Sequence, residues 1–243
     1  MWCSSKPRIW YNLRATMRVF IAFIAALFVS LVAGCVHIPS QQDDIVVIGD
    51  SVMAWNRAEG RDVGSVIGAK LNRPVLNRAV FGAQIRANSF AGLLGLSIPA
   101  QLPPGRWNWV VANGGANDLG FTCGCTNCDD AIDTLISRDG QTGYIPDLIA
   151  QALAQNAQVL WLGYYRAPET TSFEGCRPGL VEIERRIAWL AGSDDRVFFL
   201  DAETFFNPLK PALLDRDKTH PSVEGSALIG RKIVEVIEDN ARD

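Results

Sequence analysis

The chain contains two histidines, His37 and His220. The choice of a histidine that acts as a general base at neutral pH is therefore narrow. His37 lies in an N-terminal segment that we interpret below as a tether, and a folded enzyme with a histidine base must therefore use His220. Asp217 precedes His220 by three residues, which lets its carboxylate reach the ring Nδ1 and leaves Nε2 free to accept a proton. Asp215 is a second candidate for this carboxylate. An imidazole oriented by an acid is the arrangement that activates a hydroxyl nucleophile.

A serine in a turn is the candidate nucleophile. The apolar, β-branched run 45–48 is typical of a buried parallel strand, and Gly49-Asp50-Ser51 follows it at once. Ser51 would then lie at the carboxyl end of a strand and near the start of the next helix, where backbone N–H groups face a site. We interpret Asp50 as a residue that stabilises the turn. The prediction does not rest on the G-x-S-x-G motif, because Met53 stands in place of its second glycine.

Four short pieces occur in an order that suits ester hydrolysis: 49–51 (Gly-Asp-Ser), 77–82 (Asn-Arg-Ala-Val-Phe-Gly), 115–118 (Gly-Ala-Asn-Asp) and 217–221 (Asp-Lys-Thr-His-Pro). This series resembles the four sequence blocks of the SGNH (GDSL-type) hydrolase family. Ala79 departs from the glycine that is commoner in the second block.

The family resemblance implies a role for each matching residue. Ser51, Asp217 and His220 would form a catalytic triad. The backbone N–H groups of Ser51 and Gly82 and the side-chain amide of Asn117 would form an oxyanion hole. The implied activity is that of a carboxylic ester hydrolase.

Candidate strands and helices alternate along the chain. The strands are expected at residues 45–48, 74–77, 109–112, 158–162 and 197–200, and the helices at about 57–71, 145–155, 179–190 and 222–237. This alternation predicts a three-layer α/β/α fold with a mostly parallel sheet of about five strands. The resemblance implies the flavodoxin-like strand order 2-1-3-4-5. The site is expected outside the carboxyl ends of the strands.

Residues 1–34 resemble the signal peptide of a bacterial lipoprotein. They carry four basic residues and no acid, and the apolar run 19–32 is shorter than the roughly 18–20 residues of a spanning helix. The run ends in Val-Ala-Gly-Cys, a sequence similar to a lipobox with Cys35 as the lipidated residue. Met17 is a candidate for the true start, which would leave residues 1–16 upstream of it. An uncleaved anchor helix is the alternative.

Beyond the signal peptide we expect the lipidated cysteine with a short tether at 35–43 and a single SGNH hydrolase domain at 44–243. Loss of the four basic residues of the signal peptide would change the formal net charge from −3 to −7. Such a surface disfavours nucleic acid as a partner. The expected location is the bacterial cell envelope, lipid-anchored, at the periplasmic or outer-membrane face.

Four cysteines remain within the expected domain: Cys123, Cys125, Cys128 and Cys176. An even number in an exported domain predicts two disulfides, with Cys176 bonded to one member of the cluster and the other two bonded to each other. A bond between Cys123 and Cys125 would close the smallest ring and is the least favourable local bond. A zinc site with four thiolates is the competing interpretation, although the spacing differs from that of paired C-x-x-C motifs.

The expected substrate is an O-acyl ester of a carbohydrate or of peptidoglycan, or another small acyl ester, and the expected mechanism needs no cofactor and no metal. A lysophospholipase or thioesterase that acts on longer acyl chains is an alternative, as is a non-catalytic envelope lipoprotein that uses the fold for binding. Aromatic residues near the expected strand ends either line a substrate pocket or pack the core: Trp55, Phe81, Trp107, Tyr164 and Tyr165.

Overall fold

A computed structural model describes residues 44–166, 173, 175–207 and 209–241 of the chain. The described residues form a five-stranded sheet, in which the strands are β1 (Ile45–Ile48), β2 (Val75–Asn77), β3 (Trp109–Ala112), β4 (Gln158–Leu162) and β5 (Val197–Leu200). Every neighbouring pair is parallel, and the order is β2-β1-β3-β4-β5. The expected α/β fold and strand order are therefore confirmed.

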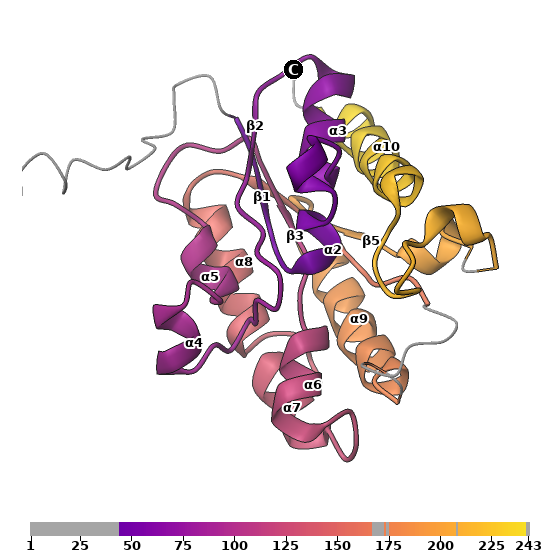
Figure 1. The fold of residues 1–243 in the computed structure, drawn as a ribbon. Helices are drawn as coiled ribbons and strands as arrows, with labels where there is room; N and C mark the ends of the chain where they lie inside the picture. Colours follow the sequence, from indigo (N-terminus) through magenta and orange to yellow (C-terminus); the bar gives the residue numbers. More distant parts are fainter. Residues whose placement is uncertain (1–43, 167–172, 174, 208, 242–243) are drawn as a thin grey trace, which may run out of the picture. The chain divides into compact units, whose positions relative to one another are not determined.

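The central strands are buried at every residue. β1, β3 and β4 consist almost wholly of Val, Ile, Leu and Trp, and helices cover both faces of the sheet. Right-handed crossovers place the helix between β1 and β2 on one face and the helices that follow β2, β3 and β4 on the other. The last helix returns to the first face, where it packs closely against the first long helix (Figure 1).

Helices of very different lengths connect the strands. The longer ones are α3 (Val63–Leu71), α6 (Ala116–Cys123), α8 (Tyr144–Ala154), α9 (Arg177–Ala191) and α10 (Val223–Asp239). The shorter α-helices are α2 (Ser51–Ala54), α4 (Ser89–Leu93), α5 (Ile98–Gln101) and α7 (Asp129–Leu135), and the 3-10 helices are η1 (Arg57–Glu59), η2 (Ala202–Thr204) and η3 (Pro211–Leu213). The face formed by α3 and α10 and the opposite face with α5, α8 and α9 enclose the core (Figure 1).

The helix expected at 57–71 is two elements. Gly60 ends η1 in the left-handed conformation (φ 64°), and Asp62 then begins α3, with its carboxylate accepting a hydrogen bond from Ser65 N at 3.1 Å. A glycine at a helix end followed by an acidic N-cap is a strong stop and restart signal. The expectation of one continuous helix was wrong because it ignored that signal.

The expected signal peptide, Met17, Cys35 and the tether at 35–43 lie outside the described residues. Within the described part of the chain, no helix combines the length and the apolar composition needed to cross a bilayer.

The carboxyl ends of the parallel strands lie along one edge of the sheet. Ser51 follows β1, Asn117 follows β3, Tyr164 follows β4 and the loop with His220 follows β5. Residues from separate parts of the chain therefore meet at this edge.

Candidate active site

Ser51 is the first residue of α2, and Asp50 is the cap that begins this helix. The Asp50 carboxylate is buried and accepts hydrogen bonds from Val52 N (2.9 Å), from Asn113 Nδ2 (3.0 Å) and from the Tyr164 hydroxyl. Asn113 Oδ1 accepts a hydrogen bond from Asp50 N at 3.1 Å in return. These bonds hold the turn in one geometry, which agrees with the structural role expected for Asp50.

The close approach of Asn113 to the turn requires a glycine before Asp50. Gly49 has φ +147°, and a Cβ at this position would lie 1.9 Å from Asn113 Oδ1. No other residue could let the two strand ends approach so closely.

His220 lies between Ser51 and Asp217. Its Nε2 is 2.8 Å from Ser51 Oγ, and its Nδ1 is 2.5 Å from Asp217 Oδ2. The other oxygen of Asp217 accepts hydrogen bonds from Thr219 N and His220 N, both at 3.0 Å. One carboxylate therefore shapes the turn and orients the ring, and Nε2 is left to accept the serine proton.

The charge state of Asp217 suits this arrangement. Partial burial opposes ionisation, but the hydrogen bonds from the His220 ring and from two backbone N–H groups outweigh it, so that the pKa of Asp217 is lowered from its ordinary value. Asp217 is therefore an anion at neutral pH.

Asp215, the second candidate for the triad acid, binds a different residue. Its Oδ2 accepts a hydrogen bond from Trp55 Nε1 at 2.7 Å, and the indole of Trp55 is stacked on His220, with ring centroids 3.8 Å apart and planes inclined by 3°. The structure therefore places Asp217 on the histidine and Asp215 on the tryptophan. The spacing of the two acids could not distinguish them.

Asn117 lies in the first turn of α6. Its Nδ2 donates one hydrogen to the Ala83 carbonyl at 3.0 Å, which leaves the second amide hydrogen available. Ser51 and Asn117 line the same cavity. An amide held in this way can donate to an oxygen that develops negative charge near Ser51.

Gly82 has a less central position than the other expected donors. It lies in the loop after β2 with φ +74° and lines a groove beside the cavity rather than the cavity itself. Among the described residues, neither the Gly82 N–H nor the Ser51 N–H has an acceptor. Both groups are therefore free to bind an oxygen of a substrate.

A buried aspartate connects the loop of Gly82 to α6. Asp118 accepts hydrogen bonds from Ile85 N (2.9 Å) and Arg86 N (2.7 Å). Burial raises the pKa of Asp118 to about 6, although the two backbone N–H groups act in the opposite direction. In the sequence, Asp118 stands out only as a member of the block 115–118, and no local pattern predicts its connection to the loop of Gly82.

Two tyrosines that follow β4 form one wall of the cavity. The Tyr164 hydroxyl donates to Asp50 and accepts from Ala116 N at 3.2 Å, and the Tyr165 hydroxyl donates to the Thr219 carbonyl at 2.8 Å. Burial, with the nearby Asp50 charge, raises the pKa of Tyr164 well above its usual range, so its hydroxyl keeps the proton. Each tyrosine therefore lines the cavity, and Tyr164 also supports the turn of Ser51 while Tyr165 supports the loop of His220.

Trp107, in contrast, precedes β3 at the opposite edge of the sheet, where it is buried.

The cavity is small. Its volume is about 100 Å³, and its lining includes Ser51, Asn117, Tyr165, Phe173, Leu180 and His220. This volume suits a group of few atoms next to the serine.

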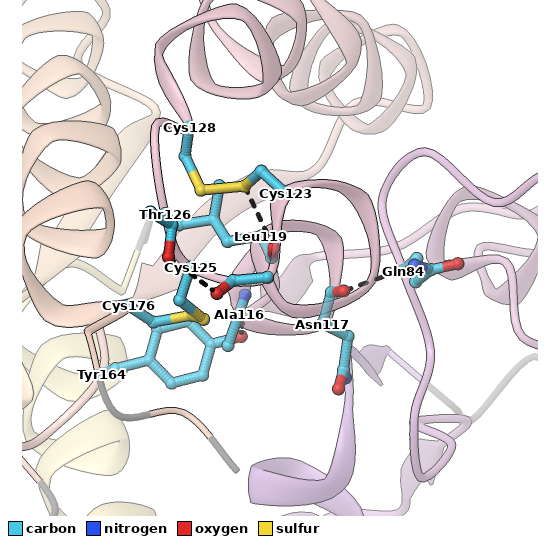
Figure 2. The surroundings of a disulfide bond; sticks show 11 residues. Gln84, Ala116, Asn117, Leu119, Cys123, Cys125, Thr126, Cys128, Tyr164 and Cys176 are labelled. Atoms are coloured by element: carbon cyan, nitrogen blue, oxygen red, sulfur yellow. Dashed lines mark hydrogen bonds between the residues drawn. A yellow bond between two sulfur atoms is a disulfide. The ribbon is translucent and has the colours of Figure 1, made fainter. Parts of the chain in front are cut away.

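The structure joins the four cysteines in two disulfides, Cys123–Cys128 and Cys125–Cys176 (Figure 2). The first closes the short segment that follows α6. The second links this segment to the N-terminus of α9, across a sequence separation of 51 residues. Since Asn117 lies in the first turn of α6 and Cys123 is the last residue of that helix, both bonds lie at the far end of the helix that carries this amide.

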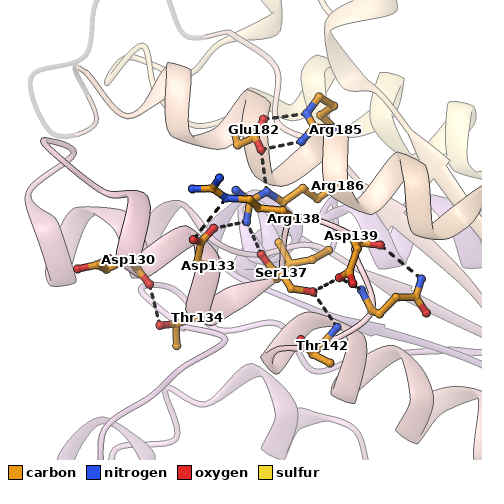
Figure 3. Close-up of polar contacts among 12 residues, drawn as sticks. Asp130, Asp133, Thr134, Ser137, Arg138, Asp139, Thr142, Glu182, Arg185 and Arg186 are labelled. Atoms are coloured by element: carbon orange, nitrogen blue, oxygen red, sulfur yellow. Dashed lines mark hydrogen bonds and ion pairs between the residues drawn. The ribbon is translucent and has the colours of Figure 1, made fainter.

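A second connection joins α7 to α9. The buried side chain of Arg186 donates to Asp133 Oδ1 (2.6 Å) and to Glu182 Oε1 (2.7 Å), as Figure 3 shows. It also donates to the Ile136 carbonyl at 2.6 Å. Within the described residues, no group of His, Cys, Asp and Glu side chains is arranged to hold a metal ion.

Comparison with known proteins identifies the class of this site. Residues 47–228 match the GDSL-like lipase/acylhydrolase family, so the chain belongs to that family and is a carboxylic ester hydrolase of the SGNH type. Among curated proteins, no sequence relative was found.

Solved structures share the fold at low sequence identity. Est24, a carbohydrate acetylesterase from Sinorhizobium meliloti, is 13% identical with a TM-score of 0.59, over 81% of this chain and 99% of that chain. A family two carbohydrate esterase from Clostridium thermocellum is 14% identical with a TM-score of 0.55, over 82% of this chain and 64% of that chain.

Proposed function

We propose that the protein hydrolyses esters by a double displacement in which Ser51 is the nucleophile and His220 the base. The observation that carries this proposal is the continuous series of contacts from Asp217 through His220 to Ser51, at 2.5 and 2.8 Å. Serine hydrolases use such a series for acyl transfer, whereas a binding module has no need of it.

In the first half of the reaction, Ser51 Oγ attacks the ester carbonyl carbon while its proton moves to His220 Nε2. The carbonyl oxygen becomes an anion that the Asn117 amide and the N–H groups of Ser51 and Gly82 stabilise. The bond to the alcohol then breaks, and the proton on Nε2 passes to the leaving oxygen. Asp217 stabilises the transient imidazolium.

In the second half, His220 removes a proton from water, and the water oxygen attacks the acyl carbon bonded to Ser51. Collapse of the second tetrahedral intermediate returns the proton to Ser51 and releases the acid. Apart from the substrate and water, these steps use only side chains and backbone groups of this chain.

The proposed substrate is a glycan or peptidoglycan O-acyl ester, or another ester with a short acyl group. The cavity of about 100 Å³ beside Ser51 supports a small acyl group. The likeness in fold to two carbohydrate esterases supports a sugar as the alcohol.

The longer-chain alternative has one observation in its favour. The groove that includes Gly82 has a volume of about 720 Å³ and is lined in part by the exposed side chains of Phe90, Leu94 and Phe121. An acyl chain could lie on such a surface, as in a lysophospholipase or thioesterase.

The proposed location is the cell envelope, with Cys35 carrying the lipid. Asp44 enters β1 at the edge of the sheet opposite the site. A tether of nine residues spans at most about 30 Å. The tether therefore joins the domain on the side away from the site, which supports a glycan rather than a lipid of that membrane as the substrate.

Activity of the full-length protein in detergent on p-nitrophenyl esters from acetyl to dodecanoyl, with Ser51→Ala as control, tests the proposal. We expect hydrolysis that depends on Ser51 and declines with chain length. A maximum at long chains would favour the lysophospholipase or thioesterase alternative, and no hydrolysis of any ester would favour a binding lipoprotein.

A further inference from the structure

The chain that leaves the nucleophile helix turns directly onto the loop that carries the base. Trp55 follows α2 as its cap residue, and Asn56 next to it adopts the left-handed conformation with φ 64°. Trp55 contacts the ring of His220. Asn56 contacts residues that follow His220 in the sequence. Ser51 and His220 are 169 residues apart in the sequence, so their alignment depends on contacts of this kind.

We propose that Trp55 and Asn56 are positioning residues that hold the imidazole of His220 in line with Ser51. This inference rests on the proposed roles of Ser51 and His220. The family resemblance implies no role for either residue, and from the sequence Trp55 is expected only to line a substrate pocket or to pack the core.

The tryptophan controls the plane of the imidazole. Asp217 holds the ring at Nδ1, but one hydrogen bond leaves the ring able to swing about that point. The parallel indole of Trp55, with centroids 3.8 Å apart, blocks this movement. Its π-face also attracts the cation that His220 becomes when it takes the serine proton.

The indole is itself anchored to the loop 215–221, which carries His220. Trp55 Nε1 donates to Asp215 Oδ2 at 2.7 Å, and Asp215 N in turn donates to the His220 carbonyl at 2.8 Å. The indole therefore contacts the loop at two points, the ring of His220 and the carboxylate of Asp215. Rotation of the indole would break the hydrogen bond as well as the stack.

Asn56 holds the other side of the loop. Its Nδ2 donates to the Pro221 carbonyl at 3.1 Å and to Ser226 Oγ at 2.9 Å, which uses both amide hydrogens. Asparagine tolerates the left-handed conformation better than most residues, and glycine tolerates it fully. The variant Asn56→Gly therefore removes these two bonds without straining the backbone.

The experiment compares kcat and KM for p-nitrophenyl acetate in full-length Trp55→Ala, Trp55→Phe, Asp215→Ala and Asn56→Gly proteins. Trp189→Ala is the matched control, because Trp189 is 65% exposed on α9, away from the site. We expect Trp55→Ala to lower kcat about 10- to 100-fold with KM within about twofold, since small misplacements of a catalytic group have effects of this size. Trp55→Phe should recover most of the loss because a phenyl ring still stacks, and Asp215→Ala and Asn56→Gly should show smaller losses in kcat.

The ring protons of His220 give a spectroscopic readout that is independent of turnover. A stacked indole shifts them upfield in the NMR spectrum, so Trp55→Ala should move these signals downfield, and His220→Ala identifies them. Melting temperatures show which variants remain folded. If Trp55→Ala does not fold, the proposal is tested by comparing kcat of Trp55→Phe and Asp215→Ala with that of wild type.

The proposal is overturned if the folded variants keep wild-type kcat or change KM alone, or if Trp189→Ala has the same effect as Trp55→Ala. A failure of the proposed function is separate: Ser51→Ala would then retain wild-type activity. In that case the NMR shift still tests the stack, but no role in catalysis remains for it.

Discussion

The two arms of the active site are built differently. The nucleophile and oxyanion arm holds Ser51, Gly82 and Asn117, and the base arm is the loop 215–221 with Asp217 and His220. On the nucleophile and oxyanion arm, the polar side chains that shape the site are buried, with Asp50 1%, Asn117 6% and Asp118 2% exposed. On the base arm, the side chain of Asp217 is 40% exposed, and the loop is held by stacking and by hydrogen bonds from the residues after α2.

This difference determines what a substitution costs. A buried polar group that loses its partner keeps its desolvation penalty. A substitution in the oxyanion arm that leaves such a group unpaired should therefore lower the stability of the protein as well as its activity. Water can replace a lost partner of the exposed Asp217 on the base arm. We therefore expect variants of the exposed residues of the base arm to lose activity with little change in stability, and variants of the buried polar residues of the oxyanion arm to lose both.

The largest effect is expected for Ser51→Ala and His220→Ala. Each should lower kcat by at least about 10³-fold, and up to about 10⁶-fold, with a melting temperature close to that of wild type. The double variant should be no worse than the worse single variant, because the residues act as a unit. Steady-state kinetics and calorimetry check this, and losses that multiply in the double variant would disprove a shared function.

Asp217→Asn should lower kcat by roughly 10³- to 10⁴-fold, since the amide no longer selects the tautomer with a free Nε2. The matched control is Asp215→Asn, which keeps an oxygen acceptor for Trp55 and should retain most of the activity. Equal losses in the two variants would contradict the assignment of Asp217 as the partner of His220.

Asn117→Ala should lower kcat by about 10²- to 10³-fold, with a smaller change in KM, because the amide acts on the charge of the transition state. It should also lower the free energy of unfolding by about 1–3 kcal/mol, because the Ala83 carbonyl loses its donor in a buried position. Loss of activity at unchanged stability would remove the contrast between the two arms at this residue.

Reduction of the disulfides should lower stability with a smaller effect on turnover. The Cys125–Cys176 bond closes a long loop, so that its loss should cost about 2–4 kcal/mol. Cys125→Ser/Cys176→Ser and Cys123→Ser/Cys128→Ser double variants, compared by denaturant unfolding, separate the two bonds. Peptide mapping without reductant should recover the same two pairs, and free thiols or stoichiometric zinc would count against them.

The smallest effect is expected from the titration of Asp118. Its pKa is about 6 in the folded protein against an ordinary value of 3.8, so the folded state binds the proton more tightly. The contribution of Asp118 to stability is therefore greatest below pH 3.8 and falls as the pH rises through 6, by at most about 3 kcal/mol. The difference in unfolding free energy between wild type and Asp118→Asn should decrease from pH 4 to pH 7, and a difference that is constant with pH would rule out a raised pKa.

The sequence by itself determined the sheet and most of the candidate residues. β1, β3, β4 and β5 have the expected bounds, because each is a short apolar run that ends in Gly, Asp or Asn, and this pattern is local. β2 was expected one residue too early, at Pro74, which lacks the N–H that a ladder hydrogen bond needs. The choice of His220 needed no structure, since so few histidines occur in the chain.

The tertiary structure alone decided which partners those residues take. Asp215 and Asp217 are two residues apart and chemically identical, but only the position of Trp55, far away in the sequence, separates their roles. The connection from Asp118 to Ile85 and Arg86, and the link between Cys125 and Cys176, likewise join segments that the sheet brings together. Spacing within a motif describes what a residue can reach along its own turn, whereas the order of parallel strands determines which distant turns meet at the same edge.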